Sequence, residues 1–306
     1  MSGADPQSQN EGETMNDTTP IAPQPAAAPA PGRSNWVLIT TSIVGGAVLF
    51  GTIVGAAITG IYSATRDSNV VPQLLTAEAE GITRIDVDAS AARFTVTCER
   101  PGGADDDVFT LSTSTGEREW RMETRRGALR VEPVNRWFGG FSLIGPRSDA
   151  RQDVALLLPA SACEGGSPLD AGLAIGAGEM QVDGPYGELD IEIGAGEIRV
   201  DGTAREVDVE IGAGEAALYL GDVRSASLSV SAGSLRGGFE GRAPGELDIE
   251  VSAGAVDLRL PDEGYAIESS VAAGDLDNRL KTDPQASRQI EVDIAAGSVT
   301  LRPQDR

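Results

Sequence analysis

A short motif containing an Ala-Gly pair recurs along the second half of the chain and constrains the fold more than any other feature. Two copies read LDIEIGAGEIRVDG at 189–202 and VDVEIGAGEAALYL at 207–220. A degenerate copy, IDVDASAARFTV at 85–96, has Ala92 in the glycine position. The repeated glycines, spaced by 18 to 23 residues, are Gly178, Gly196, Gly214, Gly233, Gly254, Gly274 and Gly297. This regularity is typical of stacked folds, because one such unit cannot bury its apolar face alone.

Apolar and polar residues alternate within each copy, which predicts β-strands and not helices. The apolar positions change phase by one residue at the Ala-Gly pair, between Ile193 and Ile198. We interpret this change as a tight corner, with Ala on the inside of the bend and Gly at a positive φ angle. Copies stacked at about 4.8 Å would form an all-β fold, a β-solenoid (β-helix-like) of about eight rungs. An ordinary β-sandwich is the alternative.

Residues 97–168 interrupt the repeat. They contain strand-like runs at 108–114, 118–124, 128–132 and 153–158, and an aromatic loop, NRWFGGFSLIG, at 135–145. The end of a solenoid exposes an unpaired strand edge and needs a cover, so we expect these residues to form a cap. A binding loop or a membrane-contacting loop is the alternative for the aromatic segment. We therefore divide this half into a first rung with capping strands at 80–168 and the repeat array at 169–306.

The last copy, at 290–303, is followed by three residues only, so we expect its strand edge to be the open end of the solenoid. Pro303 removes one backbone donor, and Glu291, Asp293 and Arg302 place charges along the copy. Charges and proline on an edge discourage pairing with a second chain. These features predict a mainly monomeric domain, and end-to-end stacking of two domains is the alternative.

The N-terminal part has a different composition. Residues 1–35 are rich in Pro, Ala and polar residues, which predicts a disordered tail. Residues 36–64 carry no charge and lie between Arg33 and Arg66. This stretch is long enough for a transmembrane helix, with Trp36 and Tyr62 near the two membrane interfaces. We expect an uncleaved anchor in the lipid bilayer, followed by a linker at 65–79. Small residues recur every four positions within it, which favours close packing and a helix dimer: Ala47, Gly51, Gly55 and Thr59.

The orientation of this anchor follows from the two cysteines. Cys98 and Cys163 both lie after the membrane segment, where an oxidising compartment would allow a disulfide. Two separate buried thiols are the alternative. We expect a single-pass protein of the cell membrane, with a cytoplasmic N-terminus and an extracellular C-terminal domain.

Composition excludes several classes of function. The chain has no His, so it has no His-dependent nucleophile, general base or metal site. It carries 24 basic and 47 acidic residues, a net charge of −23, which argues against nucleic acid as a partner. Some β-helical proteins cleave polysaccharides with carboxylates, but they use a cleft walled by long loops, and these repeats have short turns. We expect no enzymatic activity and no cofactor.

Stacking would align acidic residues of successive rungs into columns. One column, just after the corner, holds Glu179, Glu197 and Glu215, and another contains Asp190 and Asp208. Like charges at the spacing of strands repel each other by roughly 1 kcal/mol per pair in water. Calcium held between the carboxylates would remove this repulsion. The alternative is a solubilising surface that also opposes lateral strand pairing.

The repeated Gly-Ala-Gly pattern flanked by alternating hydrophobic residues, after one N-terminal membrane segment, resembles a bacterial family known as "putative adhesins". The resemblance covers roughly residues 80–303. It implies a surface-exposed β-strand repeat domain of unassigned biochemical role, with no catalytic residues to transfer. The resulting hypothesis is a membrane-anchored adhesin or binding module with an unidentified surface ligand or envelope protein as partner. A membrane protein that senses envelope stress through the ectodomain and signals through its tail is the alternative.

Overall fold

A computed structural model describes residues 72–90, 92–99, 107–114, 118–134, 152–164 and 167–304. The tail at 1–35, the membrane segment at 36–64 with its small residues, and the aromatic loop at 135–145 lie outside these residues, as do the predictions made for them. Within the described part of the chain, no helix has the length and apolar character needed to cross a membrane.

The described residues consist almost entirely of strands, which confirms the all-β prediction. The strands before the regular array are β1 (Leu74–Glu78), β2 (Arg84–Asp88), β3 (Arg93–Cys98), β4 (Val108–Thr113), β5 (Trp120–Arg125), β6 (Ala128–Pro133) and β7 (Asp153–Leu158), with the short helix α1 (Ala160–Glu164) after them. The array contains β8 (Leu169–Ile175), β9 (Glu179–Ile193), β10 (Glu197–Ile211), β11 (Glu215–Gly221), β12 (Ser225–Val230), β13 (Ser234–Glu240), β14 (Glu246–Val251), β15 (Ala255–Leu260), β16 (Gly264–Asn278), β17 (Lys281–Thr282) and β18 (Gln289–Pro303).

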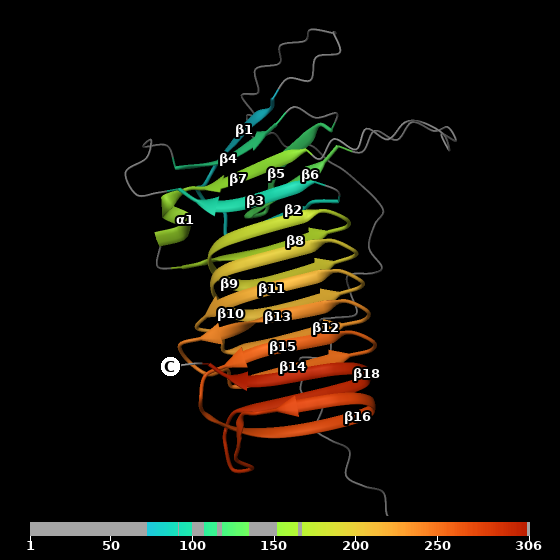
Figure 1. Cartoon of the computed structure of the whole chain (residues 1–306). Coiled ribbons are helices and arrows are strands. Elements are labelled where there is room, and N and C mark those ends of the chain that lie inside the picture. The colour runs from blue at the N-terminus through green and yellow to red at the C-terminus, as the bar shows by residue number, and fades with distance from the viewer. Residues whose placement is uncertain are drawn as a thin grey trace, which may run out of the picture. The chain divides into compact units, whose positions relative to one another are not determined.

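Successive copies of the repeat pair in parallel and in register (Figure 1). Ile198 of β10 lies opposite Met180 of β9, and Val209 lies opposite Ile191. β10 then pairs with β11 through its first half and with β12 through its second half. A rung is therefore one strand before the Ala-Gly corner and one strand after it. The degenerate copy joins the same stack, because β2 pairs with β8 and β3 pairs with β9.

Columns of aliphatic side chains fill the space that the rungs enclose. Val182, Val200 and Leu218 form one such column and are fully buried. Each buried aliphatic side chain contributes roughly 1.5–3 kcal/mol relative to an exposed one. A single rung exposes these side chains above and below, so the burial depends on the neighbouring rungs.

The corners are arranged in the opposite way from our prediction, because Ala faces solvent and Gly faces the next rung. Ala195 is exposed, whereas Gly196 is buried. A Cβ atom on Gly196 would lie 2.9 Å from the carbonyl oxygen of Gly178 and 3.0 Å from Cγ1 of Ile175. Of the seven repeated glycines, Gly274 and Gly297 have positive φ angles, at 151° and 135°. Close packing, and not a left-handed backbone, therefore explains the glycine in the other five copies.

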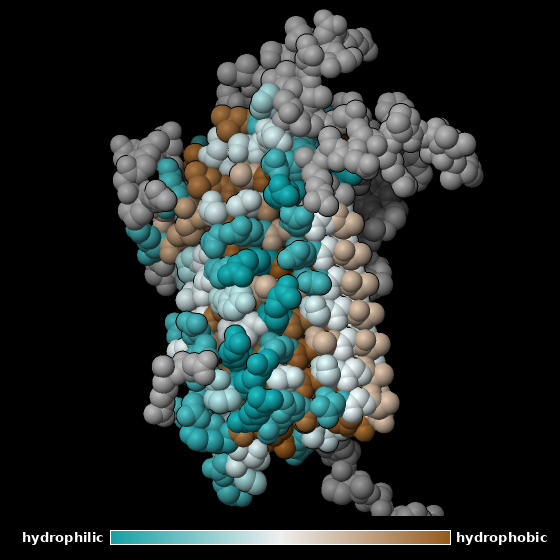
Figure 2. Space-filling view, viewed as in Figure 1, coloured by the Kyte–Doolittle hydropathy of each residue, from teal (hydrophilic) through white to brown (hydrophobic). Residues whose placement is uncertain are grey.

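The corners also continue the hydrogen-bond ladder from rung to rung. The Ala195 N–H donates to the Gly176 carbonyl over 2.7 Å, and the Ala213 N–H donates to the Gly194 carbonyl over 2.8 Å. The exposed methyl groups form a regular pale-brown column along the right-hand edge of the molecule in Figure 2. The bend thus costs no backbone hydrogen bonds, which makes each corner as regular as the strands beside it.

At the N-terminal end, β6 and β7 form a further rung, although their sequence lacks the Ala-Gly motif. β6 pairs in parallel with β2, and β7 pairs in parallel with β3. The predicted strands of this region are present, and β5, β4 and β1 cover the end in antiparallel pairs. Trp120 is buried here, and its Nε1–H donates to Oε1 of Gln152 over 3.1 Å. The expected cap is therefore built from strands.

The C-terminal end differs from our prediction, because the last copy in the sequence is not the last rung. β18 pairs with β14 and β15 on one side and with β16 on the other. β16, which precedes β18 in the chain, is therefore the outermost strand, and Figure 1 shows it beyond β18. The predicted open edge at 290–303 is occupied, so Pro303 and the charges of β18 do not protect a free edge.

Candidate interaction surface

The strands before the corners form a sheet whose outer surface is strongly acidic. The columns follow the observed register: Asp190 lies opposite Asp208, Glu192 opposite Glu210, and Glu250 opposite Asp293. We name this surface the acidic face; its carboxylates are Glu188, Asp190, Glu192, Glu206, Asp208, Glu210, Glu246, Asp248, Glu250, Glu291 and Asp293. The serines of β12, Ser225, Ser227 and Ser229, interrupt the columns between β10 and β14.

Several carboxylates of the acidic face bind protons more readily than free side chains do. Burial raises the pKa of Asp208, and the charges of Asp190 and Glu210 raise it further. Burial also raises the pKa of Asp248, with smaller contributions from Glu246 and Glu291. Repulsion along the columns is thus present in the folded protein and is stronger where a carboxylate is half-buried.

Relief of this repulsion gives a testable prediction. Asp208→Ser copies the serine that follows in the same column, Ser227, and should stabilise the fold by roughly 0.5–1 kcal/mol at pH 7. Because the pKa of Asp208 is raised in the folded state, the native protein binds more protons, and stability should increase as the pH falls toward that pKa. The gain from Asp208→Ser should therefore shrink between pH 7 and about pH 4. Thermal unfolding of both proteins across this range measures it, and a constant gain would contradict the explanation. Glu192→Gln, on an exposed position, should change stability less.

The Arg84 side chain crosses the end of the acidic face nearest the cap. Arg84 Nε lies 2.9 Å from Asp86 Oδ1, and Arg84 Nη2 lies 2.6 Å from Asp190 Oδ2. The two carboxylates raise the pKa of Arg84, although burial acts in the opposite direction and is the largest single influence. The guanidinium group therefore stays charged and balances the first carboxylates of the columns.

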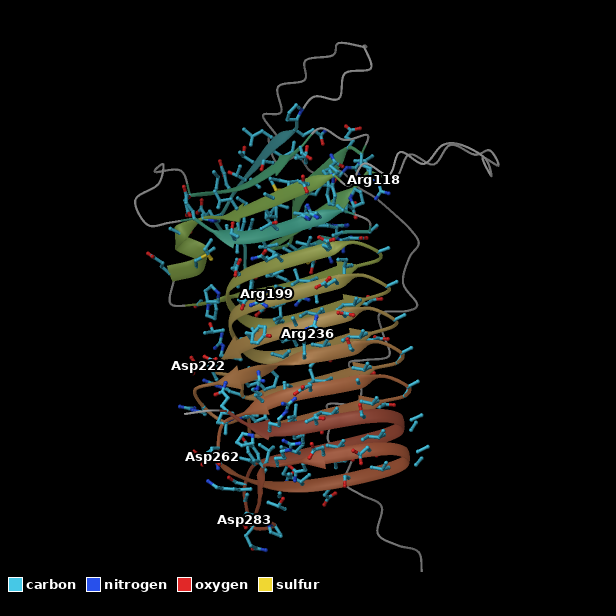
Figure 3. All side chains as sticks on the ribbon, viewed as in Figure 1. Arg118, Arg199, Asp222, Arg236, Asp262 and Asp283 are labelled. Carbon is cyan, nitrogen blue, oxygen red and sulfur yellow. A yellow bond between two sulfur atoms is a disulfide. The ribbon has the colours of Figure 1, made fainter. Side chains whose placement is uncertain are left out.

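The strands after the corners carry charges of both signs, among them Arg199, Asp201, Glu215 and Arg236, and we name their outer surface the mixed face. Figure 3 shows Arg199 and Arg236 on this side. Arg199 Nε lies 2.7 Å from Asp201 Oδ2, and its guanidinium carbon lies 4.6 Å from the centre of the Tyr219 ring. The predicted column Glu179, Glu197 and Glu215 is on this side and is aligned as expected. Arg93 binds Glu179 over 3.0 Å, and Arg236 binds Glu215 over 3.1 Å, so arginines neutralise the two ends of this column.

The structure does not turn these columns into a metal site. Within the described residues, no group of three or more His, Cys, Asp or Glu side chains is arranged to hold a metal ion. Side chains in a column point outward from a flat sheet, whereas calcium takes six to eight oxygen ligands that converge on one point. The solubilising surface and calcium bridging between carboxylates both stay predictions for these columns.

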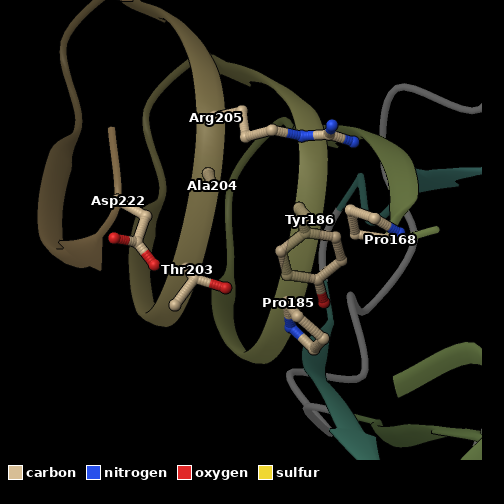
Figure 4. Close-up of a pocket in the computed structure, with 7 residues that line it drawn as sticks. All are labelled: Pro168, Pro185, Tyr186, Thr203, Ala204, Arg205 and Asp222. Carbon is tan, nitrogen blue, oxygen red and sulfur yellow. The ribbon is translucent and has the colours of Figure 1, made fainter. Parts of the chain in front are cut away.

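One hollow lies at the turns opposite the corners (Figure 4), with a volume of about 270 Å³. Its lining residues are Pro168, Pro185, Tyr186, Thr203, Ala204, Arg205 and Asp222. The Tyr186 ring is buried beneath it, and burial raises the pKa of the Tyr186 hydroxyl above its ordinary value. The hydroxyl has no hydrogen-bond partner in the structure and is shielded from solvent. The hollow is therefore open, with polar and apolar residues in its lining, and a ligand in it could not reach the buried Tyr186 hydroxyl.

The two cysteines are brought together at the capped end. Cys98 ends β3 and Cys163 lies in α1, and their sulfur atoms are joined over 2.02 Å with a Cα–Cα distance of 6.1 Å. The bond ties α1 to the edge of the stack. Ala162 and Cys163 are the helix residues that pack against the core. Of the two arrangements left open by the sequence, the structure has the disulfide.

Sequence reasoning missed one column of the acidic face and the contrast between the two faces. Glu188, Glu206 and Glu246 precede the apolar residues of their copies and align with Ser225 of β12. Their spacing is the signal that could have revealed them. The ion pairs of the mixed face could not be predicted from residue spacing, because they join residues of different columns and depend on side-chain conformation.

Comparison with known proteins gives distant similarities to solved structures. No family model matches the chain, and no curated protein matches it. A "putative adhesin" from Parabacteroides distasonis has 12% identity and a TM-score of 0.42, over 76% of this chain and 97% of that one. A "putative cell adhesion protein" from Clostridium sporogenes has 12% identity and a TM-score of 0.30, over 76% and 99%. A "putative lipid binding protein" from Parabacteroides distasonis has 13% identity and a TM-score of 0.37, over 76% and 97%.

Proposed function

We propose that this chain is a membrane-anchored, non-enzymatic binding module displayed on the outer side of a bacterial cell membrane, with its N-terminus in the cytoplasm. The observation that carries the proposal is the Cys98–Cys163 disulfide. Disulfides of this structural kind persist in oxidising compartments and are rare in the cytosol. Residues 36–64 lie before the disulfide-bonded domain and supply the proposed anchor.

The shape of the described domain fits binding better than catalysis. Its surfaces are flat sheets carrying regular columns of charge, and the hollow beside Tyr186 is open. A general acid needs a carboxyl group desolvated in a cleft beside a second, ionised group. The carboxyl groups of Asp208 and Asp248, whose pKa is raised, instead lie on the outer surface of a sheet, where neighbouring carboxylates repel them. We therefore assign these surfaces to contact with a ligand or an envelope protein.

The sign of the acidic face restricts the partner. A dense array of carboxylates repels nucleic acids, acidic polysaccharides and anionic lipid headgroups, and this repulsion is weakened by salt. The mixed face carries arginines already paired with carboxylates, such as Arg199 with Asp201. A partner that meets the acidic face would need positive charge or hydrogen-bond donors at its surface.

Site-specific labelling tests the proposed topology. Ser231→Cys places a thiol on an exposed corner, and Ser8→Cys places one in the N-terminal tail. With a membrane-impermeant maleimide, we expect Ser231→Cys to be labelled in intact cells or spheroplasts and Ser8→Cys only after permeabilisation. The wild-type protein, whose cysteines are bonded to each other, is the matched control. Labelling with the reverse pattern would overturn the orientation. Retention of the full chain by whole cells or wall fractions then tests binding.

A further inference from the structure

The outermost rung leaves a long strand edge without a partner. β16 is hydrogen-bonded to β18 on its inner side, and β17 pairs only with its first two residues, Gly264 and Tyr265. Residues 266–278 have no ladder partner on the outer side within the described part of the chain. Val271 is 42% exposed there. At the opposite end, β4 and β5 cover the equivalent edge in antiparallel pairs.

The backbone of this edge has a defined polarity. The N–H groups of Ala266 and Arg279 donate inward, to the carbonyls of Arg288 and Leu301. Successive residues of a strand point their backbone N–H and C=O groups to opposite sides. The residues that alternate with Ala266 and Arg279 along the two strands therefore direct these groups to the open side. These residues are Ile267, Ser269 and Val271 before the corner and Leu276 and Asn278 after it.

The side chains of the same residues form the exposed end of the core. Ser269 lies opposite Val292 and Asn278 lies opposite Leu301, so polar residues replace aliphatic ones at two inward positions. Ile267 and Leu276 remain aliphatic and are only partly buried against the core. The end of the stack is thus a mixed surface, apolar near the corner and able to form hydrogen bonds farther along each strand.

We propose that β16 pairs with β16 of a second copy of the chain, end to end, about a two-fold axis that passes through the Ala-Gly corner. The axis lays each strand before the corner antiparallel to the partner's strand after it. Val271 then lies opposite Leu276 of the partner subunit, and Ser269 lies opposite Asn278 of the partner subunit. Apolar residues meet apolar residues, and hydrogen-bonding residues meet each other.

Charge and side-chain polarity together select this register among those that the backbone allows. It places Glu268 opposite Arg279 of the partner subunit. A shift of two residues one way places Glu268 opposite Asp277 of the partner subunit, which is repulsive. A shift the other way places Val271 opposite Asn278 of the partner subunit. The segment between β16 and β18 projects past β16 on the side away from the corner (Figure 1), so a partner would have to approach residues 269–278 from the corner side.

The inference deepens the proposed function by naming a partner, but the pairing itself does not depend on a membrane. β1, the described strand nearest in sequence to the proposed anchor, belongs to the cap, and β16 lies at the other end of the stack. The edge that carries the pairing is thus separated from the cap by the whole stack of rungs.

Disulfide trapping tests the register with two variants, each of which adds one free cysteine to the bonded Cys98–Cys163 pair. Ser270 and Asp277 point outward on different strands of the rung, and their backbone groups face β18, so across the proposed axis they form a non-hydrogen-bonded pair. Such pairs bring Cα atoms to about 4.5 Å, within the range of a disulfide. We expect full-length Ser270→Cys mixed with full-length Asp277→Cys in detergent to give a cross-linked dimer under mild oxidation, in excess over either variant alone.

The matched control uses the same two positions one rung deeper, Asp293→Cys mixed with Thr300→Cys, which β16 covers. A mixture of Ser270→Cys and Asp277→Cys that cross-links no more than this control would overturn the proposal. Charge reversal provides a second measurement in the same cysteine backgrounds. Glu268→Arg in both chains should abolish the cross-linked dimer, and adding Arg279→Glu should restore it. No loss with Glu268→Arg would contradict the register. Because all arms use detergent solution, failure here leaves the labelling test of the anchor unaffected.

Discussion

Gly196→Val should lower the free energy of unfolding by about 3 kcal/mol or more, because the corner has no room for a side chain. The first added atom would lie 2.9 Å from the Gly178 carbonyl oxygen, which belongs to the backbone of the adjacent rung. That oxygen accepts the Glu197 N–H over 2.9 Å, so moving it would break the ladder at the corner. Chemical denaturation of the wild type and the variant measures the difference.

A neighbouring substitution provides the control for this prediction. Ala195→Ser changes an exposed side chain on the same corner and should alter stability by no more than about 0.5 kcal/mol. Gly214→Val repeats the experiment one rung along, where the added Cβ would lie 2.5 Å from Cγ2 of Ile193. Unfolding midpoints unchanged by both valine substitutions would contradict the packing explanation of the repeated glycines.

The stacking of the rungs could be predicted because it depends on period alone. When copies recur every 18 residues, as from Gly178 to Gly214, each residue finds its counterpart in the next rung, and the columns follow directly. The same logic aligned Asp190 with Asp208 and the three glutamates after the corner. The period does not tell which corner residue faces solvent and which faces the next rung, since Ala and Gly are both small. Only the approach of the adjacent backbone to Gly196 distinguishes them.

The order of the rungs at the two ends could not be derived from the period. Any rung with the same alternation of apolar and polar residues can complete the backbone hydrogen bonds of its neighbour. β14 can therefore pair with β18 as well as with the copy that follows it in the chain. One signal was present in the sequence: the copy around Gly274 has Ser269 and Asn278 at inward positions. Polar residues there cost least on an end rung, because only one side is covered. β6 and β7 were predicted as strands but not as a rung, because residues 135–151, and not an Ala-Gly pair, separate them in the sequence.

Removing the disulfide should have the second large effect on stability. Cys98 and Cys163 are 65 residues apart, and closing a loop of that length in the unfolded chain corresponds to about 4 kcal/mol by chain entropy. Cys98→Ser with Cys163→Ser should lose up to this amount, since α1 would then be held to the stack only by its contacts with the core. The loss should begin at the capped end, where the bond joins α1 to β3.

Reductant provides the matched comparison for this last prediction. Treating the wild type with a thiol reductant should lower its unfolding midpoint toward that of the double serine variant, and the double variant should not respond. This pattern separates a bonded pair from two buried thiols, because independent thiols would make the wild type insensitive to reductant while the serine substitutions still disturbed packing. It also bears on compartment: a bond that contributes several kcal/mol is retained only where the surroundings do not reduce it. A reductant-insensitive wild type would therefore remove the observation on which the proposed extracellular location rests.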